Sequence, residues 1–205
     1  MINLDKKSYI ASGRECHCYE HPFEPSQCIK IASDHKDALR KNKAEITYYK
    51  TLYARKVDME YIAKYLGKVD TNMGRAYVYD CIRNSDGQIS KTLKHYLLNN
   101  EGDLQQIFEQ LLILRDYLLK NRILIADMHS ENILIKLNLE NKTLKTIIVD
   151  GLGDHSSIKL FGRIPSLAIA KVTRRWDKFI NREINEKFSK STNSSLKNLI
   201  ITTNS

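Results

Sequence analysis

Two short apolar runs near the middle of the chain are separated by a polar turn. Residues 133–135 (ILI) and 147–149 (IIV) have the length and side chains typical of β-strands, and residues 138–142 between them are polar. This pattern predicts a hairpin. Its two outer ends lie side by side because the strands of a hairpin run antiparallel.

Earlier in the chain, the apolar positions predict a sheet with one inserted helix. The apolar spacing of residues 34–56 indicates a helix, for which Asp34 is a candidate N-cap. Short apolar runs indicate strands within residues 4–19, on both sides of a turn at Gly13, and at residues 27–31, 61–69 and 75–82.

The pattern becomes mainly helical after residues 84–88, a break that predicts a hinge. The clearest helix is expected over residues 103–121, where apolar side chains recur at helical spacing after the candidate N-cap Asp103. Further helices are expected at residues 91–98 and 166–188. The polar residues 189–205 are expected to fray, apart from a short packed segment at 199–201.

These elements predict an α+β fold. Residues 1–83 are expected to form a small antiparallel β lobe with one inserted helix, and residues 84–205 a short, mostly helical lobe that contains the hairpin. A length of 205 residues suits one domain built from two such lobes.

Composition places the chain among globular proteins, with 42% hydrophobic and 28% charged residues. There is no N-terminal apolar segment and no apolar run long enough to span a membrane, so a cytoplasmic protein is expected. The four cysteines are then expected to be reduced thiols. Residues 16–18 (CHC) lack the second ligand pair that structural zinc needs.

The formal net charge of +9 favours an anionic partner. Nucleotide phosphates, a phosphorylated glycan, nucleic acid and a membrane surface all fit this charge. Nucleic acid is the weakest of these because the chain carries no recognition motif, so specific nucleic-acid binding is not expected.

Polar residues flank the predicted hairpin in an arrangement that suits phosphoryl transfer. Asp127 and Asn132 precede its first strand, and Asp150 ends its second, so all three are expected at one rim of a small sheet. One acid then accepts the proton of a nucleophile, while the amide and the other acid hold Mg²⁺ through oxygen ligands. The alternative is that these are ordinary turn residues, which Asp and Asn often are.

Lys30 lies inside the apolar strand QCIKI, where a buried ammonium is costly unless it is paired. Glu45, in the middle of the inserted helix, is a candidate partner. The alternatives are an edge strand that turns Lys30 to water, and a solvated Glu45 among the helix lysines. Gly13 permits close approach of a ligand to the backbone.

The last predicted helix interleaves apolar and basic residues, including Arg174 and Arg175. One interpretation is a helix packed by Trp176 with a solvated basic face. The other is an anion-binding face for substrate phosphates, which arginine suits by geometry.

In this order, the elements and motifs resemble the protein-kinase-like fold. Residues 127–132 (DMHSEN) match the catalytic-loop pattern D-x-x-x-x-N, and their D-x-H-x-x-N form resembles the aminoglycoside-phosphotransferase and lipopolysaccharide-kinase branches. Residues 150–152 (DGL) take the place of D-F-G, and CIKI that of V-A-I-K. A closer resemblance covers nearly the whole chain. QCIKI, YVYDCI, DGQISKTL and the residues around Asn132 look like the bacterial YrbL family, named for regulation by the PhoP system.

The resemblance implies a cytoplasmic kinase-like protein that uses ATP and Mg²⁺. Lys30, held by Glu45, would contact the α- and β-phosphates, and Gly13 would belong to the loop above them. Residues that would bind adenine through the hinge backbone are Asp80 and Ile82. The residues that would hold Mg²⁺ are Asn132 and Asp150. The residues implied in catalysis are Asp127, as the proton acceptor, and His129, which orients the loop or reaches the γ-phosphate.

Departures from protein kinases keep two functions open. Ile125 and Ala126 replace the His and Arg of H-R-D, Gly151 and Leu152 replace Phe and Gly, and the nucleotide-covering loop has one glycine. The first hypothesis is an ATP-dependent small phosphotransferase that acts on an anionic or sugar-like substrate. The second is a pseudokinase or nucleotide-binding regulatory module, with a protein partner, in a PhoP-type stress response.

Overall fold

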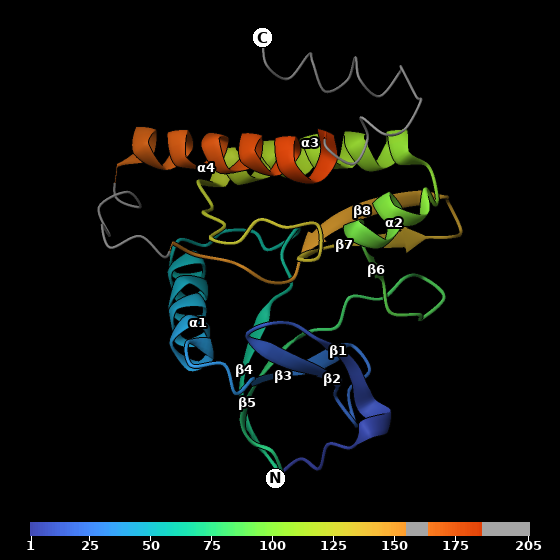
Figure 1. Ribbon diagram of the computed structural model, residues 1–205, viewed down its shortest axis with the longest axis vertical. Coiled ribbons are helices and arrows are strands. Elements are labelled where there is room, and N and C mark those ends of the chain that lie inside the picture. Colours follow the sequence, from blue (N-terminus) through green and yellow to red (C-terminus); the bar gives the residue numbers. More distant parts are fainter. Residues whose placement is uncertain (155–163, 186–205) are drawn as a thin grey trace.

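The computed structural model describes residues 1–154 and 164–185. Its N-terminal half is a five-stranded antiparallel sheet with the strand order β1-β2-β3-β5-β4. The short helix η1 (Lys6–Ser8) precedes the sheet. The strands are β1 (Tyr9–Ser12), β2 (Cys16–Glu20), β3 (Gln27–Ala32), β4 (Tyr65–Thr71) and β5 (Gly74–Asp80). Helix α1 (Ala38–Ala54) follows β3, as the sequence predicted, and lies beside the sheet (Figure 1).

Residue alternation divides the sheet into two unequal faces. Tyr77 and Tyr79 of β5 lie in the main core with the buried Tyr49 of α1, whereas Ala76 and Val78 join a small separate cluster. Because helix α1 covers only one face, the larger core and the polar site both form on that side.

The second half contains a three-stranded sheet and most of the helices. Its elements are β6 (Lys91–Thr92), α2 (Leu93–Asn99), α3 (Leu104–Asn121), β7 (Ile133–Asn138), β8 (Thr143–Ile148), α4 (Pro165–Phe179) and the π-helix η3 (Ile180–Asn185). The strand order is β6-β7-β8, so the predicted hairpin forms the pair β7–β8. Helix α3 contacts β8 and α4, and the two helices lie across one end of the molecule (Figure 1).

A single large core connects the two halves. It includes Tyr49 and Leu52 of α1, Leu114 of α3, and Trp176 of α4. The backbone also joins the halves, because Ala63 N donates to Ile148 O at 2.9 Å. The predicted division after residue 83 falls in the connection between β5 and β6.

The α+β class that the sequence predicted is confirmed, and most differences lie at element ends. Asp103 caps α3 by accepting from Gln106 N at 3.0 Å, as expected. Asp34 is not an N-cap, because α1 begins at Ala38 after Asp37, which makes no capping bond. The last helix changes to π geometry after Phe179. The segment predicted at 199–201 lies outside the described residues. Throughout residues 1–154 and 164–185, every helix is too short or too polar to cross a membrane.

Candidate active site

Residues 127–132, which we call the catalytic loop after the sequence pattern that they match, lie between α3 and β7, and backbone hydrogen bonds fix them against the end of β8. Asp127 N donates to Gly151 O at 3.2 Å, Val149 N donates to Asn132 O at 2.9 Å, and Asn132 Nδ2 donates to Asp127 O at 2.9 Å. As a result, Asp127, Asn132 and Asp150 line one cavity of about 430 Å³. The structure therefore brings together the three polar residues that flank the hairpin in sequence.

Gly151 explains why the chain has D-G-L rather than D-F-G. Its φ is +82°, and a Cβ at this position would lie 2.5 Å from Asp127 O. A larger side chain would therefore push the catalytic loop away from the end of β8. The glycine allows the two backbones to approach closely, so it positions both Asp127 and Asp150.

Lys30 is buried on the core-facing side of β3, the middle strand of the sheet, so the edge-strand alternative is wrong. Its Nζ donates to Val149 O at 2.7 Å and pairs with Asp150 Oδ2 at 3.1 Å. Burial alone would lower the pKa of Lys30, but the negative charge of Asp150 keeps that pKa well above its usual value. Burial raises the pKa of Asp150, but Lys30 outweighs this effect and holds that pKa below its ordinary range. Asp150 is therefore ionised, with Lys30 as its counter-ion.

Glu45 is buried next to this pair but has a different partner from the one expected. Its Oε1 accepts from Leu152 N at 3.0 Å, while the ion pair of Lys30 goes to Asp150. Burial, with the charge of Asp150 in second place, raises the pKa of Glu45 to about 8. A carboxyl group with this pKa is mostly protonated at neutral pH. It supports the loop after Asp150 as a neutral hydrogen-bonding group.

His129 connects the catalytic loop to the C-terminal helix. Its Nε2 lies 3.1 Å from Asp127 Oδ1, and its Nδ1 lies 3.3 Å from Glu183 Oε1. Ser130 Oγ also donates to Glu183, at 2.7 Å. Glu183 of η3 therefore positions the loop. The sequence analysis missed it because a polar residue more than 50 positions away gives no local signal.

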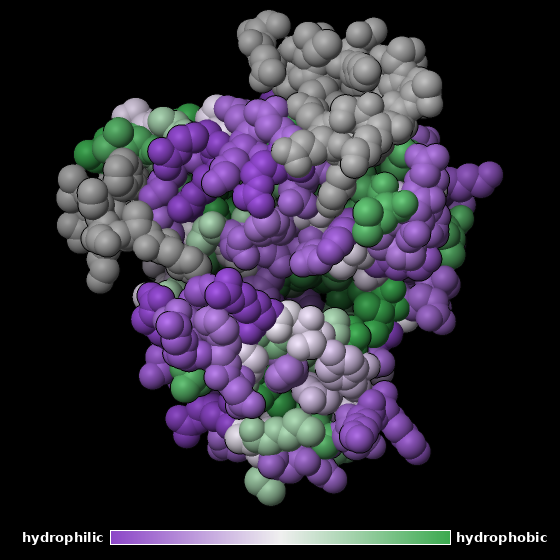
Figure 2. Space-filling view, viewed as in Figure 1, coloured by the Kyte–Doolittle hydropathy of each residue, from purple (hydrophilic) through white to green (hydrophobic). Residues whose placement is uncertain are grey.

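An apolar cavity of about 550 Å³ adjoins the polar one. Ile10, Tyr79 and Ile82 contribute to its walls, and Asp80 and Lys30 also line it. Both cavities include Gly13, Cys16, Glu131, Asn132 and Asp150. Figure 2 shows a hollow between the two halves of the molecule, with apolar residues inside it and hydrophilic ones around it. The cleft thus joins an apolar chamber to a charged one.

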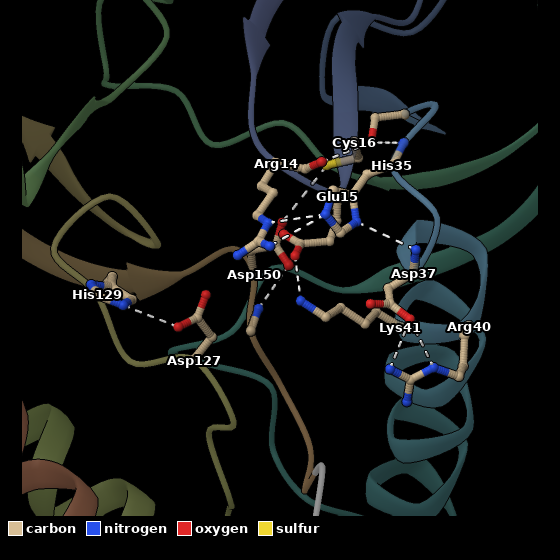
Figure 3. A network of polar contacts seen from close by, with 12 residues as sticks. Arg14, Glu15, Cys16, His35, Asp37, Arg40, Lys41, Asp127, His129 and Asp150 are labelled. Carbon is tan, nitrogen blue, oxygen red and sulfur yellow. Dashed lines mark hydrogen bonds and ion pairs between the residues drawn. The ribbon is translucent and has the colours of Figure 1, made fainter.

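The rim of the polar cavity carries charged residues that the sequence analysis did not select. Lys41 of α1 pairs with Glu15, and Arg14 contacts His35 Nε2 at 3.3 Å. Figure 3 shows Arg14 and Lys41 close to Asp150. Gly13 precedes this group, and an added Cβ there would meet only an ordinary contact. In the sequence, Gly13 next to charged residues indicated a loop. The sequence did not indicate which of these charged neighbours would reach the cleft.

Comparison with known proteins agrees with this geometry. The sequence pattern of the family described as PhoP regulatory network protein YrbL matches residues 2–184. The chain belongs to the YrbL family. The YrbL proteins of Escherichia coli (strain K12) and Shigella flexneri are each 33% identical to it over 183 residues, which is 88% of this chain and 87% of theirs.

A solved kinase-domain structure resembles this YrbL-family chain with a TM-score of 0.51 and 15% sequence identity. The similarity covers 73% of the chain and 51% of the kinase-domain structure, so the chain spans about half of that protein's length. At this identity the likeness establishes the protein-kinase-like fold alone.

Proposed function

We propose that this YrbL-family protein is an ATP-dependent phosphotransferase. The observation that carries the proposal is the meeting of Asp127, Asn132 and Asp150 around one cavity, with the buried Lys30 paired to Asp150. Phosphoryl transfer needs a proton acceptor, oxygen ligands for Mg²⁺ and a cation for the phosphates. Each of these requirements has a candidate among the four residues.

The apolar chamber is the proposed site for adenine. It is lined by Asp80, the last residue of β5, and by Ile82 of the connection between the halves. The Ile82 amide has no hydrogen-bond acceptor among the described residues. Such an amide, together with a nearby carbonyl, suits the edge of a base. A nucleotide bound there extends its phosphates toward Lys30 and Gly13, where the two cavities meet.

Asn132 and Asp150 fit a magnesium ion by the chemistry of their donor atoms, because Mg²⁺ prefers carboxylate and carbonyl oxygens. Asn132 uses its amide nitrogen to bind Asp127 O, which leaves its carbonyl oxygen as the metal-ligating atom. When bound, Mg²⁺ supplies positive charge that neutralises the phosphates. In its absence, Lys30 supplies the counter-charge to Asp150.

Asp127 is the proposed proton acceptor for the substrate hydroxyl. Its side chain is 56% exposed, so it is accessible to a substrate. His129 lies between Asp127 and Glu183 and restricts the orientation of the acid. The acceptor substrate is proposed to be anionic or sugar-like, in keeping with the net charge of +9. A cytoplasmic location, where ATP is abundant, is part of the same proposal.

A second candidate function is a pseudokinase or regulatory module in a PhoP-type response. The pairing of Lys30 with Asp150 favours it, because these two proposed ligand-binding groups already have each other as partners within the protein. The matched family is described as part of the PhoP regulatory network. A module of this kind would bind nucleotide, or a protein partner, without transferring phosphate.

Thermal unfolding with ATP, in the presence and absence of Mg²⁺, tests the nucleotide site. We expect stabilisation that requires Mg²⁺, disappears in Asp150→Ala and persists in the control Asp70→Ala, which removes an exposed carboxylate of β4. No stabilisation of the wild type would contradict both the kinase and a nucleotide-gated module.

Turnover of ATP then separates the two candidates. We expect Asp127→Ala to lower turnover by about 10²- to 10⁴-fold while leaving the Mg²⁺-dependent stabilisation intact. Equal turnover in the mutant and the wild type would exclude Asp127 as the proton acceptor. Nucleotide binding without any turnover in the wild type would instead support the regulatory module.

A further inference from the structure

A third cavity, of about 420 Å³, borders the catalytic loop and shares no lining residue with the apolar chamber. It shares Ala126, Asp127 and His129 with the polar cavity. Ile125 and Met128 of the same loop region also line it, and its remaining walls come from α4 and η3. The proposed proton acceptor is therefore accessible from two sides: from the side of the phosphates and from this additional chamber.

Three basic residues face this chamber at intervals of one helical turn: Arg174, Lys178 and Arg182. All three are exposed, and none forms a hydrogen bond or ion pair with any residue of the described parts of the chain. Arg175 differs from them. It donates to Ile125 O at 2.7 Å and pairs with Asp154 at 3.1 Å, so its charge serves the fold.

The rest of the chamber is mostly apolar. Ile125 and Phe179 are buried, and Met128 is half-buried beside them. The chamber thus combines an apolar base, three cations that have no partner among the described residues, and two acids. Asp127 lies at its opening, and Glu183 is held by Ser130 and lies 3.3 Å from His129 Nδ1. Its volume is in the range of small-molecule pockets, whereas a folded protein or a nucleic-acid helix needs an open surface.

From this juxtaposition, and resting on the proposed phosphotransferase function, we infer that the chamber binds the phosphoryl acceptor. We also infer the class of the acceptor: a small hydroxylated molecule that carries a phosphate monoester, such as a sugar phosphate. Three cations suit a dianion, the hydroxyl faces Asp127, and the carbon skeleton contacts the apolar base.

The transfer step balances with the residues and substrates named. The acceptor hydroxyl oxygen forms a bond to the γ-phosphorus while the bond from that phosphorus to the bridging oxygen of ATP breaks. The bridging oxygen keeps the electron pair and leaves as part of ADP. The hydroxyl proton passes to Asp127.

Trp176, the single tryptophan of the chain, is buried behind the chamber wall and provides an indirect probe of the chamber. Its ring lies 5.6 Å from that of Phe179, which lines the chamber. We would follow Trp176 fluorescence during titration with glucose 6-phosphate at constant ionic strength and without nucleotide. Glucose provides the neutral match, and gluconate replaces the phosphate with a carboxylate.

We expect saturable binding of glucose 6-phosphate, weaker binding of gluconate, and no response to glucose. The double variant Lys178→Ala/Arg182→Ala is expected to bind the phosphate at least about tenfold more weakly, since each charge-assisted contact contributes on the order of one factor of ten. The control Lys68→Ala removes an exposed lysine of β4 and should bind like the wild type.

Equal affinities of the double variant and the wild type for the phosphate would overturn the inference, as would a stronger response to gluconate. The fluorescence readout requires no catalysis, so it is independent of the proposed function. If the phosphate binds as expected while ATP with Mg²⁺ fails to stabilise the protein, the phosphotransferase function and the acceptor role are overturned, although an anion site exists.

Discussion

Basic side chains lie near the catalytic loop in two places, and they differ in whether their charges are paired within the protein. Lys30 is buried, bonded to Val149 O and paired with Asp150. Lys178 and Arg182, which line the third chamber, are exposed and have no partner within the described residues. Lys30 lines the apolar cavity, which shares Asn132 and Asp150 with the polar cavity, and Asp127 lines both the polar cavity and the third chamber.

The difference separates a charge that the fold needs from charges that it does not. A buried ammonium is tolerated only with a partner, so Lys30 and Asp150 stabilise each other before any ligand binds. Like charges one helical turn apart repel each other slightly. A bound anion removes that repulsion, which is why the exposed group suits a ligand and the buried group suits a preorganised site.

The largest expected effect comes from removing the buried charge. Lys30→Met leaves Asp150 without its counter-ion, and we expect a loss of about 2 to 3 kcal/mol in the free energy of unfolding. Removing one partner of a fully buried ion pair typically costs about 3 to 5 kcal/mol. The loss expected here is at or below the low end of that range, because the side chain of Asp150 is 37% exposed. Urea unfolding in the absence of nucleotide measures the loss.

Lys145→Met is the matched control for this variant. Lys30 pairs with a carboxylate, and its Nζ lies 4.8 Å from the centre of the Tyr79 ring. Lys145 has the same kinds of partner, with its Nζ 4.3 Å from the centre of the Tyr61 ring, but its pair with Glu60 is at the surface. We expect a loss below about 1 kcal/mol. Equal losses in the two variants would mean that burial of the Lys30 pair does not distinguish it.

The next effect tests the close approach that aligns the catalytic loop. Gly151 and Gly87 have nearly the same φ, +82° and +84°, but an added Cβ has open space at Gly87 and lies 2.5 Å from Asp127 O at Gly151. Gly87→Ala should cost about 1 kcal/mol for the left-handed backbone alone. Gly151→Ala should cost about 1 kcal/mol more, because the backbone must also move.

Chemical denaturation of both glycine variants gives the difference between them. Similar costs would show that the contact with Asp127 O relaxes freely, and that Gly151 is needed only for its backbone angle. In that case Gly151→Ala should also keep the turnover of ATP. The expected larger cost should instead be accompanied by reduced turnover.

The sequence predicted the buried group far better than the exposed one. A lysine within an apolar strand and two polar residues beside a hairpin are local signals, so Lys30, Asn132 and Asp150 were selected from the pattern alone. The partners of these residues were harder to predict from the sequence. The sequence analysis selected Glu45 as the partner of Lys30, but burial raises the pKa of Glu45, and Lys30 pairs with Asp150 instead. Which carboxylate pairs with Lys30 depends on distances in the folded protein, and residue spacing in the sequence does not give these distances.

The basic residues of α4 show more clearly what the sequence could not predict. The periodicity of the last helix predicted a basic face, yet it grouped Arg174 with Arg175. Only the packing shows that Arg175 binds Ile125 O and Asp154, whereas Arg174 faces the chamber. Strand β6, with two residues, was missed because so short a strand has no period.

A different kind of effect, on the dependence of stability on pH, tests whether Glu45 is neutral. Its pKa rises from 4.5 to about 8 on folding, so between these values the folded chain binds more protons than the unfolded chain. Stability from this group is therefore greatest below pH 4.5 and is lost as the pH rises toward 8. Glu45→Gln keeps an acceptor for Leu152 N and does not titrate.

Urea unfolding of the wild type and Glu45→Gln at several pH values measures this contribution. We expect the stability of the wild type relative to the variant to fall steadily from about pH 5 to pH 8. A difference that stays constant over this range would mean that Glu45 is already ionised in the folded protein. The ion pair with Lys30 that the sequence suggested would then be the better description.

The smallest expected effect concerns the exposed group itself. Lys178→Ala should change the free energy of unfolding by less than about 0.5 kcal/mol, and slightly in the stabilising direction, because it relieves repulsion from Arg174 and Arg182. Arg175→Ala, three positions away, should cost about 2 kcal/mol, because it removes charge-assisted bonds to Ile125 O and Asp154.

Unfolding in a phosphate-free buffer at low and high salt checks both values. Screening should reduce the small gain of Lys178→Ala and leave most of the loss in Arg175→Ala, whose contacts are partly buried. A large loss in Lys178→Ala at either salt concentration would show that the fold depends on this lysine. It would then belong with Lys30, among the charges that support the structure, and the chamber would keep only two cations free for an anionic ligand.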